Sequence, residues 1–309
     1  MKILITGAGG MVGQNISEKL NLSSYDLLTP KKNELNLLNK KNLQEYLEQN
    51  KPEFIIHAAG IVGGILFNID NQARSLHENI VISTNLLECA IANNIKKILN
   101  ISSSCIYPKN IQNPIREADL LKAELEPTNE GYAIAKIAML KLCEYYSEIQ
   151  DISFKTIIPC NLYGKYDKFN QEYSHMIPSV IMKIHKDLIN NESTVSIWGD
   201  GTSRREFMYV EDLANFILFA IKNFSKLPQN LNVGTGKDFT INEYYREIAR
   251  VIGFKGEFTH DYSKPSGMKQ KLVDISYLKK LGWSSTFNLN DGLKNTYEYY
   301  LNLNKDEKL

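Results

Sequence analysis

Residues 2–13 read Lys-Ile-Leu-Ile-Thr-Gly-Ala-Gly-Gly-Met-Val-Gly, and this stretch decides the fold. The apolar run at its start predicts a short strand, the glycines predict a tight turn, and a helical pattern follows. Gly7 permits the turn, Gly10 lets the backbone approach a pyrophosphate at the helix N-terminus, and Gly13 allows close packing of helix on strand. A strand, a glycine-rich turn and a helix in this order form the first βα unit of a dinucleotide-binding fold. The candidate cofactor-binding residues in this unit are Gly7, Gly10, Met11 and Val12.

Further strand–helix units follow the first one. Short apolar runs predict the strands, and longer stretches with apolar residues at helical spacing predict the helices between them. Four successive βα steps and a fifth strand support an α/β fold with a Rossmann-type, doubly wound parallel sheet. The predicted strands cover residues 2–6, 25–29, 52–57, 97–101 and 154–158, and the predicted helices cover 43–49, 71–93 and 132–148.

The character of the chain changes after Pro159. The pattern there predicts a smaller, mostly helical C-terminal substrate domain. A helix at 210–220 and a strand at 231–233 are expected to return to the first domain. We therefore predict a Rossmann domain of residues 1–160, joined by 206–235, and a second domain made of 161–205 and 236–309. The expected elements of the second domain lie within 174–178, 194–198, 241–253, 264–272, 277–283 and 290–301.

Composition limits the classes of protein that fit. A chain of 309 residues suffices for one large domain or two modest ones, and a net charge of +1 lacks the basic excess of a nucleic-acid-binding protein. No apolar run approaches the ~20 residues of a membrane span, and the sequence runs from Met1 straight into a strand, without the pattern of a signal peptide. The four cysteines have no metal-binding spacing, which predicts reduced thiols, no metal site and a cytoplasmic protein. They are Cys89, Cys105, Cys143 and Cys160.

The cofactor choice depends on the segment after the second strand. An acidic residue there would bind a ribose 2′-hydroxyl and disfavour NADP. Lys31 and Lys32 follow Pro30 instead, and their ammonium groups can pair with a 2′-phosphate, so the sequence favours NADP(H). Glu34, slightly further on, leaves NAD open. After the third strand, Ala58 and Ala59 are small enough to let the chain pass close to the cofactor phosphates and ribose.

Two stretches carry candidate catalytic groups. Tyr132 and Lys136 lie four residues apart on a predicted helix and so share a face. An ammonium beside a phenol favours the phenolate, which makes the tyrosine a usable proton donor and acceptor near neutral pH. The serine-rich segment 102–105 follows the strand at 97–101, at the sheet edge where open α/β sheets bind ligands. A tyrosine and a lysine at this spacing usually cover a solvated face, so the pair gains weight only from the dinucleotide site before it.

The motifs taken together resemble those of a known family. The GxxGxxG spacing suits short-chain dehydrogenases, and the run Ser-Ser-Cys-Ile-Tyr-Pro-Lys at 103–109 is specific within that superfamily. Over almost its whole length the chain resembles the extended short-chain dehydrogenase/reductases that act on nucleotide sugars. The closest resemblance is to the GDP-L-fucose synthase family of GDP-4-keto-6-deoxy-mannose 3,5-epimerase/4-reductases. The matching stretches are 10–13, 34–38, 62–65, 103–109, 126–130, 132–138, 161–164, 174–175, 198–199, 205–207, 232–236 and 271–274.

The resemblance implies a role for individual residues. Ser103, Tyr132 and Lys136 would form a reductase triad, while Cys105 and His175 would be the epimerase base and acid. It implies a GDP-sugar substrate and an NADP(H) cofactor, and it implies a homodimer built from the helices at 71–93 and 132–148. The implied cofactor contacts in this part of the chain are Tyr132, Lys136, Asn161 and His175. The implied substrate-binding residues are Val62, Asn161, Lys183, Trp198, Arg205 and Lys271.

The sequence also departs from the family pattern. Glu130-Gly131-Tyr132 stands where the family has Glu-Pro-Tyr, which predicts a looser approach to the tyrosine. Ser102 replaces a common glycine, and Gly9 stands where an arginine helps to grip the 2′-phosphate. These changes leave the expected chemical groups in place.

Three other functions stay open from the sequence alone. One is a C4 reductase without epimerisation, acting on a GDP-4-keto-6-deoxy-heptose or a related sugar of surface-polysaccharide synthesis; retention of Cys105 and His175 argues against outright loss of epimerisation. Another is a 4,6-dehydratase, which needs an acidic pair where Cys105-Ile106 stands. The last is an idle NADP-binding scaffold, against which the intact serine–tyrosine–lysine set argues.

Overall fold

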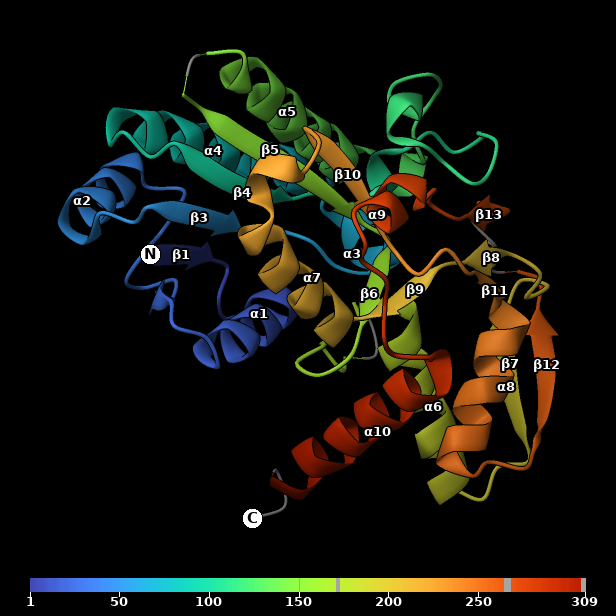
Figure 1. Cartoon of the computed structure of the whole chain (residues 1–309). Coiled ribbons are helices and arrows are strands. Elements are labelled where there is room, and N and C mark those ends of the chain that lie inside the picture. The colour runs from blue at the N-terminus through green and yellow to red at the C-terminus, as the bar shows by residue number, and fades with distance from the viewer. Residues whose placement is uncertain (150, 171–172, 264–267, 307–309) are drawn as a thin grey trace.

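The computed structural model describes residues 1–149, 151–170, 173–263 and 268–306, and its centre is a six-stranded parallel sheet (Figure 1). The strands lie in the order β10-β5-β4-β3-β1-β2. The chain starts at β1, adds β2 at one edge, and then crosses back to add β3, β4, β5 and β10 on the other side of β1, which confirms the predicted α/β fold with a doubly wound sheet. The strands are β1 (Lys2–Thr6), β2 (Asp26–Leu28), β3 (Phe54–His57), β4 (Lys97–Ile101), β5 (Ser153–Pro159) and β10 (Asn230–Val233).

Helices cover both faces of this sheet. One pair packs together on one face, α1 (Met11–Asn21) and α7 (Val210–Lys222). The other face is covered by α2 (Lys40–Asn50), α4 (Gln72–Ala92) and α5 (Glu130–Ser147), with α4 and α5 side by side (Figure 1). Short 3₁₀ turns are η1 (Ser104–Ile106), η2 (Glu117–Asp119), η3 (Pro127–Asn129) and η4 (Phe224–Lys226).

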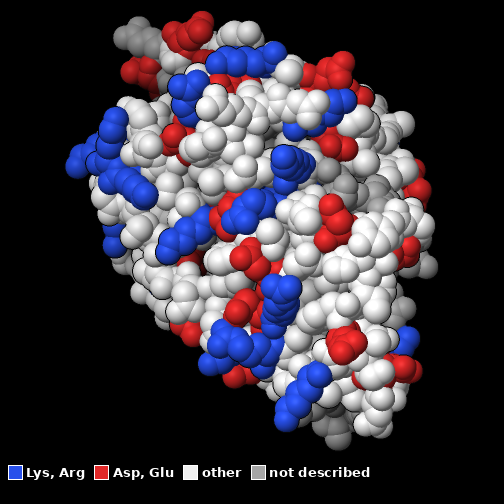
Figure 2. Space-filling model, turned by 90° about the vertical axis from the view of Figure 1, so that its right-hand side faces the viewer, with Lys and Arg blue, Asp and Glu red and all other residues white. Residues whose placement is uncertain are grey.

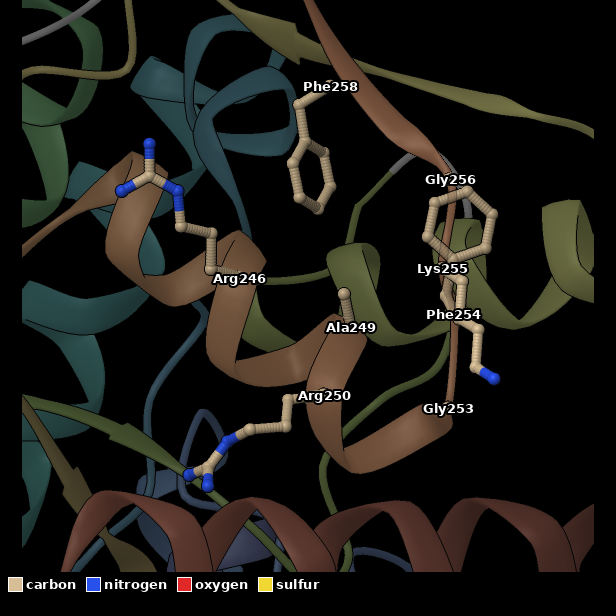
Figure 3. Close-up of a pocket in the computed structure, with 8 residues that line it drawn as sticks. All are labelled: Arg246, Ala249, Arg250, Gly253, Phe254, Lys255, Gly256 and Phe258. Atoms are coloured by element: carbon tan, nitrogen blue, oxygen red, sulfur yellow. The ribbon is translucent and has the colours of Figure 1, made fainter.

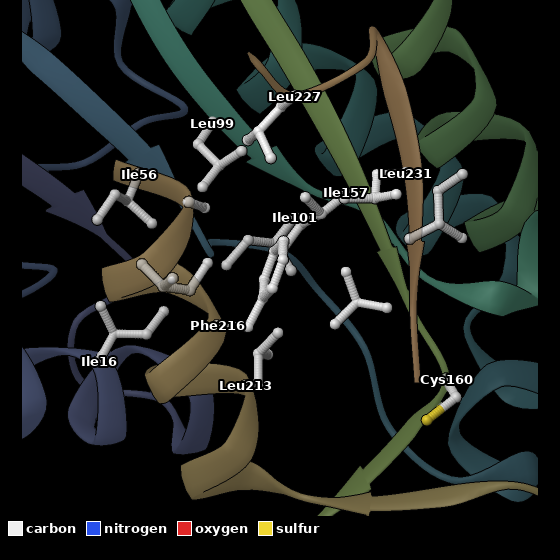
Figure 4. Close-up of a cluster of buried hydrophobic side chains, with 14 of the residues drawn as sticks. Ile16, Ile56, Leu99, Ile101, Ile157, Cys160, Leu213, Phe216, Leu227 and Leu231 are labelled. Atoms are coloured by element: carbon white, nitrogen blue, oxygen red, sulfur yellow. The ribbon is translucent and has the colours of Figure 1, made fainter. Parts of the chain in front are cut away.

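Alternate residues of the central strands serve two apolar cores. Ile3 and Ile5 belong to a cluster with Ile16 of α1 and Phe216 of α7, two residues that Figure 4 draws against the sheet. Leu4, between the two isoleucines, belongs to a second cluster with α2, α4 and α5. Successive side chains of a strand point to opposite faces, so a strand covered on both faces needs an unbroken apolar run. This requirement explains why the run at 3–5 predicts its strand so clearly.

The C-terminal part of the chain contains two small sheets that lie beside the main sheet, one of three strands (β11-β8-β13) and one of two strands (β12-β7) (Figure 1). In addition, β6, the next strand after β5 in the chain, pairs with β9, the strand directly before α7. The return of α7 and β10 to the main sheet is present, while the exact division into two domains stays a prediction. The remaining helices are α6 (Met176–Ile189), α8 (Ile241–Ile252), α9 (Ser276–Lys280) and α10 (Leu289–Asp306). The remaining strands are β6 (Asn161–Tyr163), β7 (Thr194–Trp198), β8 (Arg204–Arg205), β9 (Phe207–Tyr209), β11 (Phe239–Thr240), β12 (Glu257–Asp261) and β13 (Gln270–Lys271).

Some elements differ from the sequence prediction. The segment after the third strand holds an extra helix, α3 (Ile65–Asp70), separated from α4 by Asn71. The strand β12 was not predicted, and the described part of 264–272 contains β13, while 264–267 lie outside the described residues. A strand of two residues is too short for the alternation of apolar and polar side chains to be recognised in the sequence.

Within the described ranges no helix is both long and apolar enough to cross a membrane, and no group of three or more His, Cys, Asp or Glu side chains is arranged to hold a metal ion.

A buried carboxylate holds the long connection between β4 and α5. Asp119 accepts a hydrogen bond from Arg116 N at 2.9 Å and one from Lys122 Nζ at 2.8 Å, and these contacts lower the pKa of its carboxyl to about 2. We expect Asp119→Asn to lower the free energy of unfolding by about 1 kcal/mol at pH 7. Because the folded-state pKa is depressed, this stabilisation is present above pH ~4 and is lost as the pH falls through about 2.

Urea denaturation of the wild type and the variant at pH 7 and pH 3 measures this difference. The gap between the two proteins should shrink at the lower pH. Lys122→Ala separates the two contacts: it removes the partner that lowers the pKa of Asp119 most but leaves the backbone contact in place, so it should lose only part of the difference. Equal stabilities at pH 7 would show that Asp119 does not hold this connection.

Candidate active site

The glycine-rich turn between β1 and α1 has the shape of a dinucleotide cradle. Gly7 has a φ of +72°, and a Cβ there would lie 2.7 Å from Ala59 Cα. A Cβ at Gly13 would lie 2.2 Å from the Gly7 carbonyl oxygen, so both positions require glycine. Gly10 N donates to Gly7 O at 3.0 Å and closes the turn. The first turn of α1 has no side-chain cap and no acidic residue, so its N–H groups suit the pyrophosphate of a dinucleotide.

The remaining predicted cofactor contacts line the same edge of the sheet. Met11 and Val12 begin α1 and Ala58 and Ala59 follow β3, and all four are half-buried. Lys31 is exposed after β2, where a 2′-phosphate would lie. These residues fit the cofactor that the sequence predicts.

Glu34, the residue that left NAD open, is engaged within its own loop. Its Oε2 accepts a hydrogen bond from Lys31 N at 2.6 Å, and Glu34 N donates to Lys31 O at 2.9 Å. The carboxylate therefore closes a turn. A ribose 2′-hydroxyl would have to compete with that backbone contact.

The serine, tyrosine and lysine expected to act together lie at the carboxyl end of β4 and on α5. Ser103 precedes η1, and its Oγ accepts from Cys105 N at 3.4 Å. Tyr132 and Lys136 occupy one face of the first turns of α5 and are both buried, with Lys136 Nζ 5.8 Å from the centre of the Tyr132 ring. Lys136 Nζ also donates to Ile101 O at 3.0 Å, which fixes the helix against the end of β4.

Burial dominates the protonation of this pair. It raises the pKa of the Tyr132 phenol well above its ordinary value, and the nearby Cys105 raises it further. Burial lowers the pKa of Lys136 to about 8, while Cys105 acts in the opposite direction. The spacing of Tyr132 and Lys136 predicts a phenol whose pKa is lowered by the ammonium, whereas in the structure burial raises the pKa of the phenol because it disfavours the charged phenolate. A protonated tyrosine is suited to donate a proton to an oxygen that gains negative charge.

Cys105 lies among cationic groups, as its expected role requires. Burial raises the pKa of its thiol, whereas the charge of Lys271, a hydrogen bond from Ser103 and the charge of Lys136 lower it. The same thiol influences Tyr132, so the charges of these groups act on one another within a single buried site. Desolvation favours the thiol and the two ammonium groups favour the thiolate.

His175 stands at the N-cap position of α6, where its side chain makes no capping hydrogen bond. Its pKa is lowered by burial and by the charges of Lys168 and Lys271. Ser174 shapes the turn before it, because its Oγ donates to Lys168 O and accepts from Asn170 N, both at 2.7 Å. Lys271 thus acts electrostatically on both predicted epimerase groups, the thiol and the imidazole.

The predicted substrate-binding residues fall into two groups. Arg205 and Lys271 are neighbours in register on β8 and β13, and Asn161 is tied to the same place because its Nδ2 donates to Glu206 O at 3.0 Å. Lys183 on α6 donates to the backbone oxygen of Ser196 in β7, the strand that ends at Trp198. Val62 lies on the loop before α3 and is 37% exposed.

Glu206 joins several segments of the chain, a structural role that we did not predict from the sequence. Its side chain is 1% exposed and accepts hydrogen bonds from three backbone amides at 2.7–3.0 Å, those of Thr235, Gly236 and Val273. This carboxylate joins the start of β9, the loop after β10 and the chain after β13, and so fixes Arg205 beside it. The only signal in the sequence is that the acidic Glu206 comes directly before the apolar run 207–210, which predicts a buried strand.

Other predicted or conspicuous features lie outside this site. His57, expected to be a structural strand-end histidine, has Nδ1 2.8 Å from Thr6 Oγ1, and burial lowers its pKa to about 3.

A hollow of about 460 Å³ between α8 and β12 contains none of the predicted site residues (Figure 3). Basic and acidic side chains are interspersed over the face that carries β12 and α8 (Figure 2). The hollow is lined by Arg246, Ala249, Arg250, Gly253, Phe254, Lys255, Gly256 and Phe258.

Comparison with known proteins agrees with this geometry. The model of the NAD dependent epimerase/dehydratase family matches residues 3–234. The chain is 54% identical to the GDP-L-colitose synthase of Yersinia pseudotuberculosis over 98% of both chains, and 42% identical to the GDP-L-fucose synthase of Azorhizobium caulinodans over 98% of this chain and 97% of that one. The NADP-bound structure of MlghC, a GDP-mannoheptose C4 reductase from Campylobacter jejuni, superimposes with a TM-score of 0.88 at 29% identity, covering 97% of this chain and 98% of that chain. The chain therefore belongs to the NAD dependent epimerase/dehydratase family, among the NAD(P)-dependent GDP-sugar epimerases and reductases.

Proposed function

We propose that this enzyme is an NADPH-dependent 3,5-epimerase and 4-reductase of a GDP-4-keto-6-deoxy-sugar, making GDP-L-fucose or a related GDP-6-deoxy-sugar. The observation that carries the proposal is the position of Cys105 among the reductase groups: its backbone N–H donates to Ser103 Oγ at 3.4 Å, and its buried thiol is close enough to Tyr132 and Lys136 to act on the pKa of both. Identity of 54% to a GDP-L-colitose synthase, against 42% to a GDP-L-fucose synthase, favours GDP-L-colitose as the product. Colitose carries no hydroxyl at C3, so with that substrate the epimerase step would invert C5 alone.

Epimerisation needs a base, an acid and donors for an enolate. The protons next to the C4 ketone are acidic, and the Cys105 thiolate removes one, leaving the negative charge on the C4 oxygen. Ser103 and Tyr132 donate hydrogen bonds to that oxygen. Protonated His175 then delivers a proton to the opposite face of the carbon and takes a replacement proton from solvent, while the thiol releases its proton to solvent. Each inversion is therefore redox-neutral: it starts and ends with a ketone at C4, and only the configuration of the neighbouring carbon changes.

Reduction follows at the same oxygen. Bound NADPH supplies the hydride for C4, and Tyr132 donates a proton to the alkoxide. In our proposal Tyr132 and Lys136 hold the nicotinamide ribose, and Asn161 and His175 line the same end of the cofactor site. Lys31 pairs with the 2′-phosphate, supported by its exposure and by the engagement of Glu34 in a turn.

The GDP portion would lie toward the C-terminal part. Arg205 and Lys271 suit the diphosphate, because two neighbouring strands present them in register. Trp198, with 42% of its surface exposed, can cover the base or the sugar, and Lys183 beside the same strand adds a positive charge. Val62 would face the sugar from the loop before α3. A cytoplasmic location is proposed as well, because all four cysteines are unpaired and the base must be a reduced thiol.

One experiment tests the function. NADPH and NADH consumption is measured with GDP-4-keto-6-deoxy-mannose, with its 3-deoxy counterpart and with the corresponding heptose, in deuterated water, and the products are identified by NMR and mass spectrometry. We expect NADPH-dependent products with deuterium next to the former ketone. Reduction without deuterium would indicate a C4 reductase of the kind represented by MlghC. NADPH binding without turnover of any substrate would indicate an idle scaffold.

We also propose that the chain forms a homodimer through α4 and α5. Ile134, Tyr145 and Ile149 lie along one side of α5 and its C-terminal extension and are 40%, 61% and 51% exposed. The spacing of 11 residues places Ile134 and Tyr145 on one helical stripe, Ile149 follows in the bend after the helix, and α4 packs alongside. A second copy of the same two helices would cover this stripe by the symmetry of an isologous contact.

Ile134→Glu is expected to convert the dimer into a monomer, because it would bury an unpaired carboxylate at the contact. Size-exclusion chromatography with light scattering measures the mass, and circular dichroism verifies the fold. Ile69→Glu on α3, at a similarly exposed isoleucine, is the matched control and should remain dimeric. A monomeric wild type, or a dimer in both variants, would contradict this interface.

A further inference from the structure

The start of α5 lacks a cap of its own. Asn129 is the N-cap residue, but its side chain makes no hydrogen bond to the first turn, and its Oδ1 has no partner among the described residues. The first N–H groups of a helix have no partner inside the helix. Tyr132 is the third residue of α5, so whatever holds this first turn also determines where the phenol lies.

Gln72, the first residue of α4, supplies the missing acceptor. Gly131 N donates to Gln72 Oε1 at 2.8 Å, and Gln72 Nε2 donates to Pro127 O at 2.6 Å. One amide side chain therefore bridges η3 and the first turn of α5, across 59 residues of sequence. The two contacts use opposite ends of the amide, so they fix both its position and its orientation.

Gly131 makes this contact possible. A Cβ at this position would lie 2.6 Å from the backbone oxygen of Gln72 and 2.9 Å from its Oε1. Any larger residue would push α4 away from α5 at this point. The sequence predicts that Gly131 loosens the approach to Tyr132; the structure instead shows a buried glycine whose N–H is held by a second helix.

We propose that Gln72 is a positioning residue for Tyr132, acting through the Gly131 amide as a cap supplied by a neighbouring helix. The inference rests on the proposed function, since Tyr132 is the proton donor there. Gln72 fixes the direction of the first turn of α5, and the turn fixes the distance from the phenol to the substrate oxygen. A displacement of about 1 Å at such a group costs up to roughly 100-fold in rate.

The test compares four proteins: the wild type, Gln72→Ala, Gln72→Glu and the control Arg74→Ala. Arg74 lies on the same helix, is exposed, and pairs with Glu78 at 2.8 Å. In Gln72→Ala, kcat for reduction should fall about 10- to 100-fold, with the KM for the GDP-sugar and the Kd for NADPH within about twofold. Gln72→Glu keeps an acceptor for the Gly131 amide but loses the donor to Pro127 O, so it should regain part of the lost kcat. Arg74→Ala should match the wild type.

A second readout does not depend on turnover. Hydrogen exchange of the peptide containing Gly131 and Tyr132, measured by mass spectrometry with NADPH present, should be faster in Gln72→Ala than in the wild type and Gln72→Glu. A wild type without turnover would refute the proposed function, while the exchange result still decides the capping role. The inference is overturned if Gln72→Ala keeps kcat within twofold, if only KM rises, or if exchange is unchanged. If Gln72→Ala folds poorly, Gln72→Asn replaces it: its side chain is one methylene shorter, and the same changes in kcat and hydrogen exchange are expected.

Discussion

Tyr132→Phe should abolish hydride transfer to the keto-sugar while leaving NADPH bound. The change removes one oxygen from a ring that is 7% exposed and packed in the main core, so the fold should persist. The oxygen is the proton donor of the proposed reduction, and loss of a positioned general acid costs about 100- to 10,000-fold in rate. We therefore expect kcat to fall by that factor and the Kd for NADPH to stay within about twofold.

Stopped-flow oxidation of NADPH measures the step, and quenching of protein fluorescence measures cofactor binding. Tyr277→Phe, on α9 and 50% exposed, lies outside both the site and the proposed dimer contact; it is the matched control and should reduce the substrate at the wild-type rate. Reduction by Tyr132→Phe at a rate near the wild type would remove the tyrosine from the mechanism. In Tyr132→Phe, the rate of solvent-deuterium exchange should fall less than the rate of hydride transfer, because Ser103 still donates to the enolate oxygen.

Two effects act on the pKa of Tyr132, and both raise it: burial, and the nearby Cys105. Lys136 Nζ lies 5.8 Å from the ring centre, but it is buried as well, and desolvation penalises the charged form of each group. The result is a protonated phenol beside an ammonium whose own pKa is lowered to about 8. That arrangement suits reduction, which consumes a proton at the tyrosine. It fits less well with the idea of a preformed phenolate that the i, i+4 spacing first suggests.

Local patterns in the sequence predict the parts of this protein that depend on neighbouring residues. Gly7 and Gly13 predict the cradle because a tight βα turn leaves no room for a Cβ, and Tyr132 and Lys136 predict a shared helix face because their spacing is fixed by helical geometry. The predicted helix at 71–93 agrees with α4, but α3 just before it was not predicted, because six residues are too few for a helical period to show.

Contacts between distant segments could not be predicted in this way. Gln72 meets Gly131, and Glu206 meets Val273, because the sheet brings their elements together, and no spacing in the sequence encodes those meetings. A glycine before the catalytic tyrosine therefore suggests flexibility when read alone. In the fold it is the point where a second helix comes close enough to hold the first turn. The same reasoning applies to Lys271, whose influence on Cys105 comes from a strand far along the chain.

The last expected result concerns the base. Cys105→Ser should suppress solvent-deuterium incorporation at the carbons next to the ketone by about 100- to 10,000-fold. A serine hydroxyl is far less acidic than a thiol, so the ammonium groups that favour a thiolate cannot produce an equivalent alkoxide at neutral pH. Because burial raises the pKa of Cys105, wild-type exchange should also increase as the pH rises from 7 toward 9, and the serine variant should lose that increase.

Cys160→Ser is the matched control, because this thiol is also buried and also lies within the influence of Lys271. It lies at the end of β5 and its Sγ donates to Asn161 O at 3.5 Å, so the proposal gives it no contact with the sugar. If Cys105→Ser alone loses exchange while its NADPH affinity stays within about twofold, the thiol is the base and the surrounding charges serve it. If exchange is unchanged in Cys105→Ser, the thiol only fills the core, and the positive charge of Lys271 serves the diphosphate alone. If both variants lose exchange equally, the common cause is the disturbed Lys271, and the base must be sought elsewhere in the same pocket.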